Sequence, residues 1–243
     1  MSFETTLDLV RHEYMQRMTH GNGRLLRQVE DYAAHRSGKL LRPRMLLACA
    51  ATLPPTDNRQ ASRRTLLLAT AMEMLHNASL LHDDVVDHAT QRRGQPSVNQ
   101  RWNSTIAVLV GDYHLAQIML LLDETDDIEA TRRVNRTVLQ MVEGELLQQE
   151  VLSRGHATEE EYLQIIDGKT AALFATAAAL GNPAMEGFGL CYGRLFQMAD
   201  DLADGEAPPF VAAIQARERQ RLADLAQAGL TPPAELFSTS DLQ

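Results

Sequence analysis

Residues 81–94 read LHDDVVDHATQRRG, and this stretch decides how the whole chain is interpreted. It ends a long run of apolar and helix-forming residues, so Asp83, Asp84 and Asp87 lie at the C-terminal end of an expected helix. Carboxylates are unfavourable at that end, because they meet the negative pole of the helix dipole and one another. The stretch therefore indicates that a cation is bound there.

A second stretch, FQMADDLADGE at residues 196–206, repeats the pattern. It places Asp200, Asp201 and Asp204 at the same spacing, again just before a glycine. One such cluster is most often a solvated helix end, but two matching clusters in one chain favour bound metal. Oxygen ligands favour Mg²⁺ or Mn²⁺ over zinc, and Mg²⁺ is usually completed by substrate phosphates. The pair therefore predicts a phosphate-bearing substrate between two helices.

The composition is that of a globular helical protein. Of the 243 residues, 44% are hydrophobic and only 5% aromatic, with abundant Ala, Leu and Met. The net charge of −9 argues against a nucleic-acid binder. Two cysteines far apart suit a reduced compartment, and the N-terminus lacks a signal-peptide pattern. No apolar run approaches the ~18 residues needed to span a bilayer, so we expect a cytoplasmic protein with no integral membrane segment.

Helical spacing dominates the chain, and no convincing alternating strand is present. The pattern predicts a single all-α domain over residues 1–243, with an irregular tail after about residue 229. The predicted helices cover residues 3–18, 23–36, 40–53, 59–87, 103–122, 128–154, 158–180, 184–204 and 208–228.

The basic residues form a natural complement to diphosphate groups. Of 23 Lys and Arg residues only two are lysine, Lys39 and Lys169. Arg42 follows Lys39 by one helical turn, and Arg92 and Arg93 follow the first aspartate cluster. Each of these is more often a surface charge when taken alone, but together they suit a substrate with two diphosphates.

These residues, in this order, resemble the trans-isoprenyl diphosphate synthases, also called polyprenyl synthetases. The matching motifs run from Gly38 to Asp204 and are GKLLRP, EMLHNASLLHDDVVDHATQRRG, GELLQ, GKT and FQMADDLAD. The resemblance implies an isoprenoid-synthase-like helical bundle around a central cavity, with both aspartate clusters at its mouth. It also implies a homodimer.

The resemblance further implies a Mg²⁺-dependent prenyltransferase. Three Mg²⁺ ions would bridge the aspartates to the diphosphate of an allylic substrate, whose C–O bond ionises. Isopentenyl diphosphate then attacks the allylic cation, and loss of a proton gives a longer trans-polyprenyl diphosphate. The pyrophosphate leaving group takes up that proton in this family, so no side-chain base is assigned.

Roles follow by motif position in the resembling family. The chief metal ligands would be Asp83, Asp87 and Asp200, supported by Asp84, Asp201 and Asp204. The allylic diphosphate would be held by Arg92, Lys169, Thr170 and Gln197. Isopentenyl diphosphate would be held by Lys39, Arg42, His76 and Arg93. Without the motif, His76 would be interpreted as a half-buried histidine whose hydrogen bonds are all made within the protein.

Product length depends in this family on residues one turn before the first aspartate cluster. Bulky side chains there form a floor under the growing chain. Here the positions hold Ala78 and Ser79, with Leu75 a turn deeper. Small side chains leave the floor open, so medium or long products are expected.

The chain departs from the family pattern after Asp204. The pattern continues there into a loop with another lysine and then more helices, whereas here no lysine follows Lys169. Two alternatives stay open. One is a terpene synthase or diphosphate lyase, in which Lys39, Arg42 and Arg93 would be dispensable. The other is a truncated, partner-dependent or regulatory subunit, although both aspartate clusters are intact.

Overall fold

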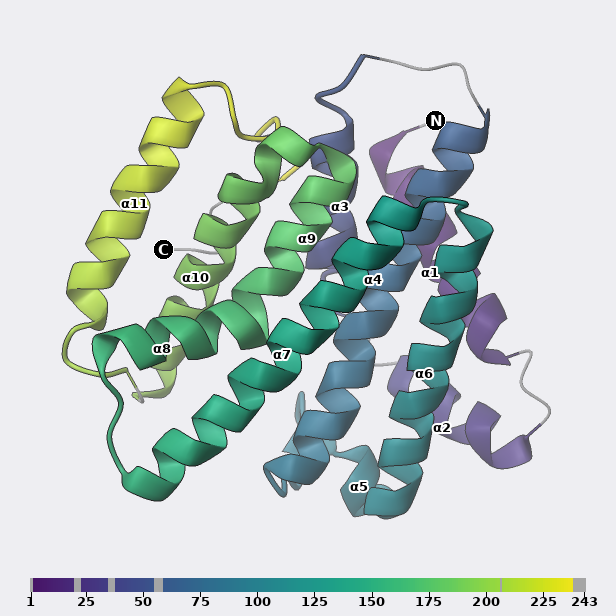
Figure 1. Cartoon of the computed structure of the whole chain (residues 1–243). Helices are drawn as coiled ribbons and strands as arrows, with labels where there is room; N and C mark the ends of the chain where they lie inside the picture. The colour runs from purple at the N-terminus through teal and green to yellow at the C-terminus, as the bar shows by residue number, and fades with distance from the viewer. Residues whose placement is uncertain (1, 20–22, 35–37, 55–58, 206, 238–243) are drawn as a thin grey trace. The chain divides into compact units, whose positions relative to one another are not determined.

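The structure is a computed structural model, and it describes residues 2–19, 23–34, 38–54, 59–205 and 207–237. These residues are almost entirely helical (Figure 1), which confirms the all-α class. The helices are α1 (Phe3–Thr19), α2 (Arg24–Ala34), α3 (Leu41–Ala50), α4 (Arg59–Val86), α5 (Val98–Arg101), α6 (Ser104–Glu124), α7 (Ile128–Arg154), α8 (Glu159–Ile166), α9 (Ala172–Gly181), α10 (Glu186–Asp204) and α11 (Val211–Gln227). Two short turns, the π-helical η1 (Asp167–Ala171) and the 3₁₀ turn η2 (Pro183–Met185), flank α9.

The predicted helices are all present, with ends that agree to within about three residues. The predicted end of the second helix, at residues 35–36, and the last residues of the tail, 238–243, lie outside the described residues. One helix was not predicted. It is α5, whose four residues are too few to show a helical period.

The chain divides into two compact units, and each is described by itself. The first unit comprises Met1–Pro43 and Asn58–Asp127, and the second comprises Arg44–Asp57 and Ile128–Gln243. In the first unit α4 lies alongside α6 (Figure 1). The long apolar stretch of α4 is buried there, and it includes Leu68, Met72 and Met74, each 0% exposed. Burial of this apolar surface supplies most of the free energy that stabilises a helix of that length.

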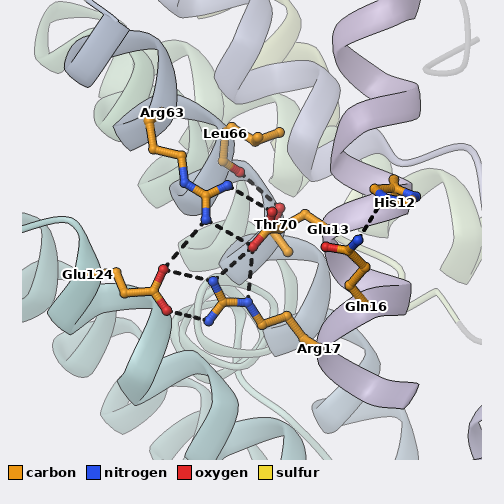
Figure 2. Close-up of polar contacts among 8 residues, drawn as sticks. All are labelled: His12, Glu13, Gln16, Arg17, Arg63, Leu66, Thr70 and Glu124. Atoms are coloured by element: carbon orange, nitrogen blue, oxygen red, sulfur yellow. Dashed lines mark hydrogen bonds and ion pairs between the residues drawn. The ribbon is translucent and has the colours of Figure 1, made fainter. Parts of the chain in front are cut away.

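A network of ion pairs joins α1, α4 and α6 (Figure 2). Glu13 accepts hydrogen bonds at 2.8 Å from Arg17, one turn later on α1, and from Arg63 of α4. Arg17 also donates two bonds to Glu124 of α6, at 2.6 and 2.8 Å. Burial alone would raise the pKa of Glu13, but the bonds to the two arginines outweigh it and the pKa is lowered. The network thus fixes α1 against α4 and α6.

A small hairpin follows the first aspartate cluster. It pairs β1 (Gln91–Arg92) with β2 (Gln95–Pro96) in antiparallel register. Its turn residues Arg93 and Gly94 have φ of 52° and 75°, as a two-residue type I′ turn requires. The expectation that the chain contains no strand is therefore wrong at this point, because strands of two residues carry no alternation to detect. The hairpin folds the chain back toward the end of α4.

In the second unit α10 lies alongside α9 and α11 (Figure 1). A Cβ atom on Gly189 of α10 would lie 2.5 Å from the carbonyl oxygen of Phe174 in α9, so glycine is required for this close approach. Aromatic rings fill the space beside it. The ring centroid of Tyr192 lies 5.1 Å from that of Phe174 and 4.9 Å from that of Phe237, which is 4% exposed. The irregular residues 230–237 are thus anchored to α10.

Among the described residues, one helix is long and apolar enough to cross a membrane by length and composition. It is α6, with a mean hydropathy of 1.6 over its most apolar window, 39% of which is buried. Core helices of soluble proteins meet the same criteria. Asp112 and the fully buried His114 interrupt its apolar run, which explains why no uninterrupted run of spanning length was found in the sequence.

Candidate active site

The first aspartate cluster lies at the C-terminal end of α4, in the first unit. Asp83 is partly exposed and Asp87 is exposed. The amide of Asp87 donates to the carbonyl of Asp83 at 2.8 Å, so the two residues stand one helical turn apart on one face. Mg²⁺ commonly takes one or two protein carboxylates and completes its shell with water and phosphate. This exposed pair fits that requirement.

The third aspartate of the cluster has a different environment. Asp84 is 3% exposed, and its Oδ1 accepts hydrogen bonds from Arg92 at 2.9 Å from Nε and 2.6 Å from Nη2. Asn99 donates to the carbonyl oxygens of Asp84 and Ala89, at 2.9 and 3.0 Å, and ties the loop to the helix end. The structure thus joins a predicted metal ligand directly to a predicted diphosphate ligand.

The residues predicted to hold isopentenyl diphosphate all belong to the first unit. Nη1 of Arg42 lies 3.3 Å from Nε2 of His76. A Cβ atom on Gly38 would lie 2.7 Å from Nη2 of Arg93, so the segment carrying the exposed Lys39 runs against that guanidinium. Burial first, and then the charges of nearby arginines, hold the pKa of His76 well below its usual range. His76 is therefore neutral and accepts a hydrogen bond from Arg42.

Sequence reasoning missed Glu73, one turn before His76 on α4. It is 6% exposed, and its Oε1 lies 3.5 Å from the side-chain amide of Asn77. Burial raises the pKa of Glu73, while the charges of Arg42 and Arg93 act in the opposite direction. Glu73 and Asn77 line a cavity of about 240 Å³ together with Val10, Arg11, Tyr14, Met15, Ala33 and Leu40. Glu73 begins the motif EMLHNASLLHDDVVDHATQRRG, but the sequence analysis assigned it no role.

In the second unit, Lys169 and Thr170 are carried by the π turn η1. A continuous helix was predicted over residues 158–180, and the structure interrupts it with this turn. A Cβ atom on Gly168 would lie 2.6 Å from the carbonyl oxygen of Gln140 in α7, so the turn touches the backbone of that helix. Nζ of Lys169 lies 2.7 Å from a carboxylate oxygen of Glu145, the acid of the GELLQ motif. π turns inside helices frequently mark functional sites.

A chain of hydrogen bonds connects η1 with the second aspartate cluster. The hydroxyl of Thr170 donates to Oε1 of Gln197 at 2.6 Å, and Nε2 of Gln197 donates to Asp201 at 2.8 Å. The hydroxyl of Tyr162 donates to the other oxygen of Asp201 at 2.5 Å. This donation, after burial, raises the pKa of Tyr162 well above its usual value. Thr170, Gln197 and Asp201 are therefore one connected group.

The remaining aspartates of the second cluster, Asp200 and Asp204, are exposed at the end of α10. Gly205, with φ of 74°, then ends the helix in the left-handed conformation. Across the residues that the structure describes, no three His, Cys, Asp or Glu side chains are grouped closely enough to hold a metal by themselves. Exposed carboxylates with open positions suit a metal that is shared with a phosphate ligand.

Several polar residues of this region escaped the sequence analysis. They are Glu73, Glu145, Tyr162, Asp167 and Arg194. Glu145 could have been found, because it lies in the recognised motif GELLQ, at residues 144–148. Glu73 could also have been found, because it is the first residue of a recognised motif. Tyr162 and Arg194 contact their partners only through the fold, and no motif marks their positions.

The fold and the two aspartate clusters define a protein of the isoprenoid synthase class. The chain belongs to the polyprenyl synthetase family, whose sequence profile matches residues 23–213. It is 38% identical over 189 residues to the all-trans-nonaprenyl-diphosphate synthase (geranyl-diphosphate specific) of Rhodobacter capsulatus, covering 74% of this chain and 57% of that protein.

Solved structures agree with this assignment. A decaprenyl diphosphate synthase from Rhodobacter capsulatus has a TM-score of 0.78 and 28% identity, covering 98% of this chain and 82% of that one. A polyprenyl synthase from Caulobacter crescentus, complexed with calcium and isoprenyl diphosphate, has a TM-score of 0.74 and 29% identity, covering 98% and 83%. By sequence, the chain spans 57% to 60% of the length of four curated relatives that it matches.

Proposed function

We propose that this protein is a Mg²⁺-dependent prenyltransferase that condenses isopentenyl diphosphate with an allylic diphosphate to give a longer trans-polyprenyl diphosphate. The observation that carries the proposal is the pair of aspartate clusters, each in direct contact with a predicted diphosphate ligand. Asp84 bonds Arg92 in the first unit, and Asp201 bonds Gln197 in the second. Family membership supports the same reaction.

The metal would be held by Asp83, Asp87 and Asp200, with Asp84, Asp201 and Asp204 in support. We expect three Mg²⁺ ions, with Mn²⁺ as a substitute, because every candidate ligand is an oxygen atom. A relative in the same family binds calcium together with an isoprenyl diphosphate, which supports a divalent cation in this role. The bound ions supply positive charge to the diphosphate that leaves.

The allylic diphosphate would be bound by Arg92, Lys169, Thr170 and Gln197. Both cations of this set have carboxylate partners, Asp84 for Arg92 and Glu145 for Lys169. These partners hold each cation in one place before substrate arrives, so less side-chain entropy is lost on binding. The proposed role of this set is to stabilise the charge that develops on pyrophosphate as the C–O bond breaks.

Isopentenyl diphosphate would be bound by Lys39, Arg42, His76 and Arg93. The neutral state of His76 suits this role, because a neutral imidazole next to Arg42 can still donate one hydrogen bond to an anion. The double bond of isopentenyl diphosphate then forms the new C–C bond, and the proton that is lost passes to pyrophosphate, as in the family. The remaining requirement is that water is kept from the allylic cation.

Medium or long products are proposed, because the positions before the first cluster hold small side chains. Ala78 is 1% exposed and Leu75 is 2% exposed. The hydroxyl of Ser79 is bonded to the carbonyl oxygen of His76 at 2.9 Å, so this side chain stays close to its own helix. None of these side chains is large enough to block a long apolar chain.

We also propose that the protein acts as a homodimer in the cytoplasm. Leu109, Met119 and Leu120 of α6 are 58%, 67% and 56% exposed, and apolar exposure of this kind favours a partner surface. We propose that a second copy of this chain covers this face of α6, because the family that the sequence resembles forms homodimers. The two free cysteines, Cys49 and Cys191, are buried and suit a reducing compartment.

One experiment tests the proposal. The purified protein is incubated with Mg²⁺, isopentenyl diphosphate and farnesyl diphosphate, and the products are identified by mass. Elongated diphosphates are expected. Pyrophosphate with a hydrocarbon or alcohol would instead indicate a terpene synthase or diphosphate lyase, and no turnover would indicate a partner-dependent or regulatory subunit.

A further inference from the structure

A partly buried arginine in the second unit connects three elements and has no part in the site predicted from sequence. Arg194 of α10 donates to both carboxylate oxygens of Asp167, at 2.6 Å from Nε and 2.7 Å from Nη2. Its Nη1 donates to Glu218 of α11 at 2.7 Å. The side chain of Arg194 is 16% exposed, and Glu218 is 7% exposed. Paired, charge-assisted bonds of this geometry are among the strongest polar contacts in proteins.

Asp167 is the first residue of η1, the turn that carries Lys169 and Thr170. Besides the Arg194 pair, α10 contacts this turn at two more positions. A Cβ atom on Gly193 would lie 2.5 Å from Cα of Ala171, and Gln197 accepts from Thr170 at 2.6 Å. The contacts with α10 therefore fix η1 at its beginning, its middle and its end.

The turn needs such support, because π-helical turns are rare and less favourable than the regular α-helix. If η1 relaxed to α-helical hydrogen bonding, the segment would shift by one residue. Such a shift rotates a side chain by about 100° about the helix axis. Lys169 would then leave Glu145, and Thr170 would leave Gln197. The hydrogen bonds to Asp167 also raise the pKa of Arg194, although burial acts in the opposite direction. Arg194 therefore stays charged in its contacts with Asp167 and Glu218.

We propose that Arg194, held in place by Glu218 of α11, is a positioning residue that maintains the π turn and so directs Lys169 and Thr170 to the allylic diphosphate. This inference rests on the proposed function, in which Lys169 and Thr170 bind that diphosphate. Arg194 itself is not counted among the substrate ligands, because its Nε, Nη1 and Nη2 all donate to Asp167 and Glu218. Its effect on the reaction passes through Asp167.

The kinetic test compares conservative variants. Arg194→Lys keeps the charge but loses the paired bonds, and Glu218→Gln keeps the shape but loses the charge. We expect Arg194→Lys to raise KM for the allylic diphosphate about tenfold, and Glu218→Gln about threefold, while KM for isopentenyl diphosphate stays within about twofold. The matched control is Arg217→Gln, one position away on α11, which removes an exposed ion pair to Glu159 and should change neither KM.

A second readout does not depend on turnover. Amide hydrogen exchange over residues 167–171 should accelerate by about tenfold in Glu218→Gln and Arg194→Lys, but not in Arg217→Gln, while exchange in α6 stays unchanged. This measurement remains decisive if the wild-type protein proves inactive, which would refute the proposed function alone.

The proposal is overturned by either of two results. One is an unchanged rate of amide hydrogen exchange over residues 167–171 in both Arg194→Lys and Glu218→Gln. The other is a fall in melting temperature with both KM values unchanged, or with both raised equally, because a merely structural arginine would behave in that way.

Discussion

Arg92 and Asp84 form an ion pair at 2.6 Å, in which the carboxylate is almost completely buried and the guanidinium is one-third exposed. The hairpin β1–β2 carries Arg92 back to the end of α4 and makes this contact. A buried carboxylate in such a pair holds the arginine in a fixed orientation. Asp84 therefore fixes the orientation of Arg92 beside the end of α4.

The first prediction concerns that pair. In Asp84→Asn the negative charge that pairs with Arg92 is lost, although an amide oxygen remains to accept its hydrogen bonds. We therefore expect KM for the allylic diphosphate to rise about tenfold. The Mg²⁺ concentration for half-maximal rate should stay within about twofold, since Asp83 and Asp87 remain. Steady-state kinetics at several Mg²⁺ concentrations measure both quantities. A greatly increased Mg²⁺ requirement would show instead that Asp84 is a direct metal ligand.

The second prediction concerns the exposed aspartates. Asp83→Ala and Asp200→Ala should each reduce turnover by at least about a thousandfold, because each removes an anchor for the charge that balances the leaving diphosphate. Both positions are solvent-accessible, so the melting temperature should change little. Asp123→Ala, at an exposed position near the end of α6, is the control. Normal rates in either cluster variant would refute the metal-site assignment.

The third prediction concerns product length. Ala78→Phe and Ser79→Phe place a bulky ring one turn before the first aspartate cluster, where small side chains leave space. We expect products shorter than those of the wild type, with the first condensation still proceeding, because the ring blocks only the growing chain. Mass spectrometry of the products measures their chain length. An unchanged distribution of lengths in both variants would contradict the proposal that positions 78 and 79 limit the growing chain. Overpacking costs about 1–3 kcal/mol, so stability is checked in parallel.

Much of this architecture could be predicted from sequence, because apolar spacing and turn residues locate long helices well. The helix over 128–154 was predicted with its exact bounds, and the one over 59–87 to within one residue. The aspartate clusters and Lys169 were found because their spacing is local. Features that depend on single-residue geometry were not found. The hairpin after the first cluster and the π turn at Asp167–Ala171 each involve too few residues to alter a periodic pattern.

The support of the candidate site was the least predictable part. Arg194 meets Asp167 and Glu218 across 27 and 24 positions of sequence, and nothing local to any of the three indicates the contact. Conversely, Arg92 was assigned to substrate alone, because an ion pair eight positions away across a hairpin cannot be read from helical spacing. Tertiary contacts decide which charges meet, and a single sequence does not state them.

The fourth prediction concerns association. Leu109→Glu and Met119→Glu each place a charge on the exposed apolar face of α6. If this face meets a second copy, the variants should become monomeric, because an unpaired buried charge costs several kcal/mol at an interface. Light scattering coupled to size-exclusion chromatography measures the mass. Ala116 is also exposed on α6 and lies on the same face, seven positions after Leu109, so Ala116→Glu should have the same effect. A wild-type protein that is monomeric at assay concentration would refute the dimer.

The last prediction concerns alkaline stability. Glu30 of α2 is 0% exposed, and neither carboxylate oxygen has a hydrogen-bond partner among the described residues. Burial, with a smaller contribution from Asp31, raises its pKa to about 8. The folded protein therefore holds a proton that the unfolded chain releases near pH 4.5. Stability is full below that pH and falls as pH rises toward 8, by about 2 kcal/mol between pH 6.5 and 8.

Glu30→Gln removes this proton linkage, so its free energy of unfolding should decline by about 2 kcal/mol less than that of the wild type over the same interval. The neighbouring His114 lies with Nδ1 3.7 Å from Oε1 of Glu30, and burial lowers its pKa to about 4. Because the unfolded chain still holds part of this proton at pH 6.5, His114 raises stability by about 0.4 kcal/mol between pH 6.5 and 8. This contribution is the same in the wild type and in Glu30→Gln, so it cancels in the difference between them. Urea unfolding at pH 6.5, 7.2 and 8 measures the difference, with Glu4→Gln on the exposed face of α1 as control. Parallel curves for Glu30→Gln and the wild type would show that Glu30 is ionised in the folded protein at neutral pH.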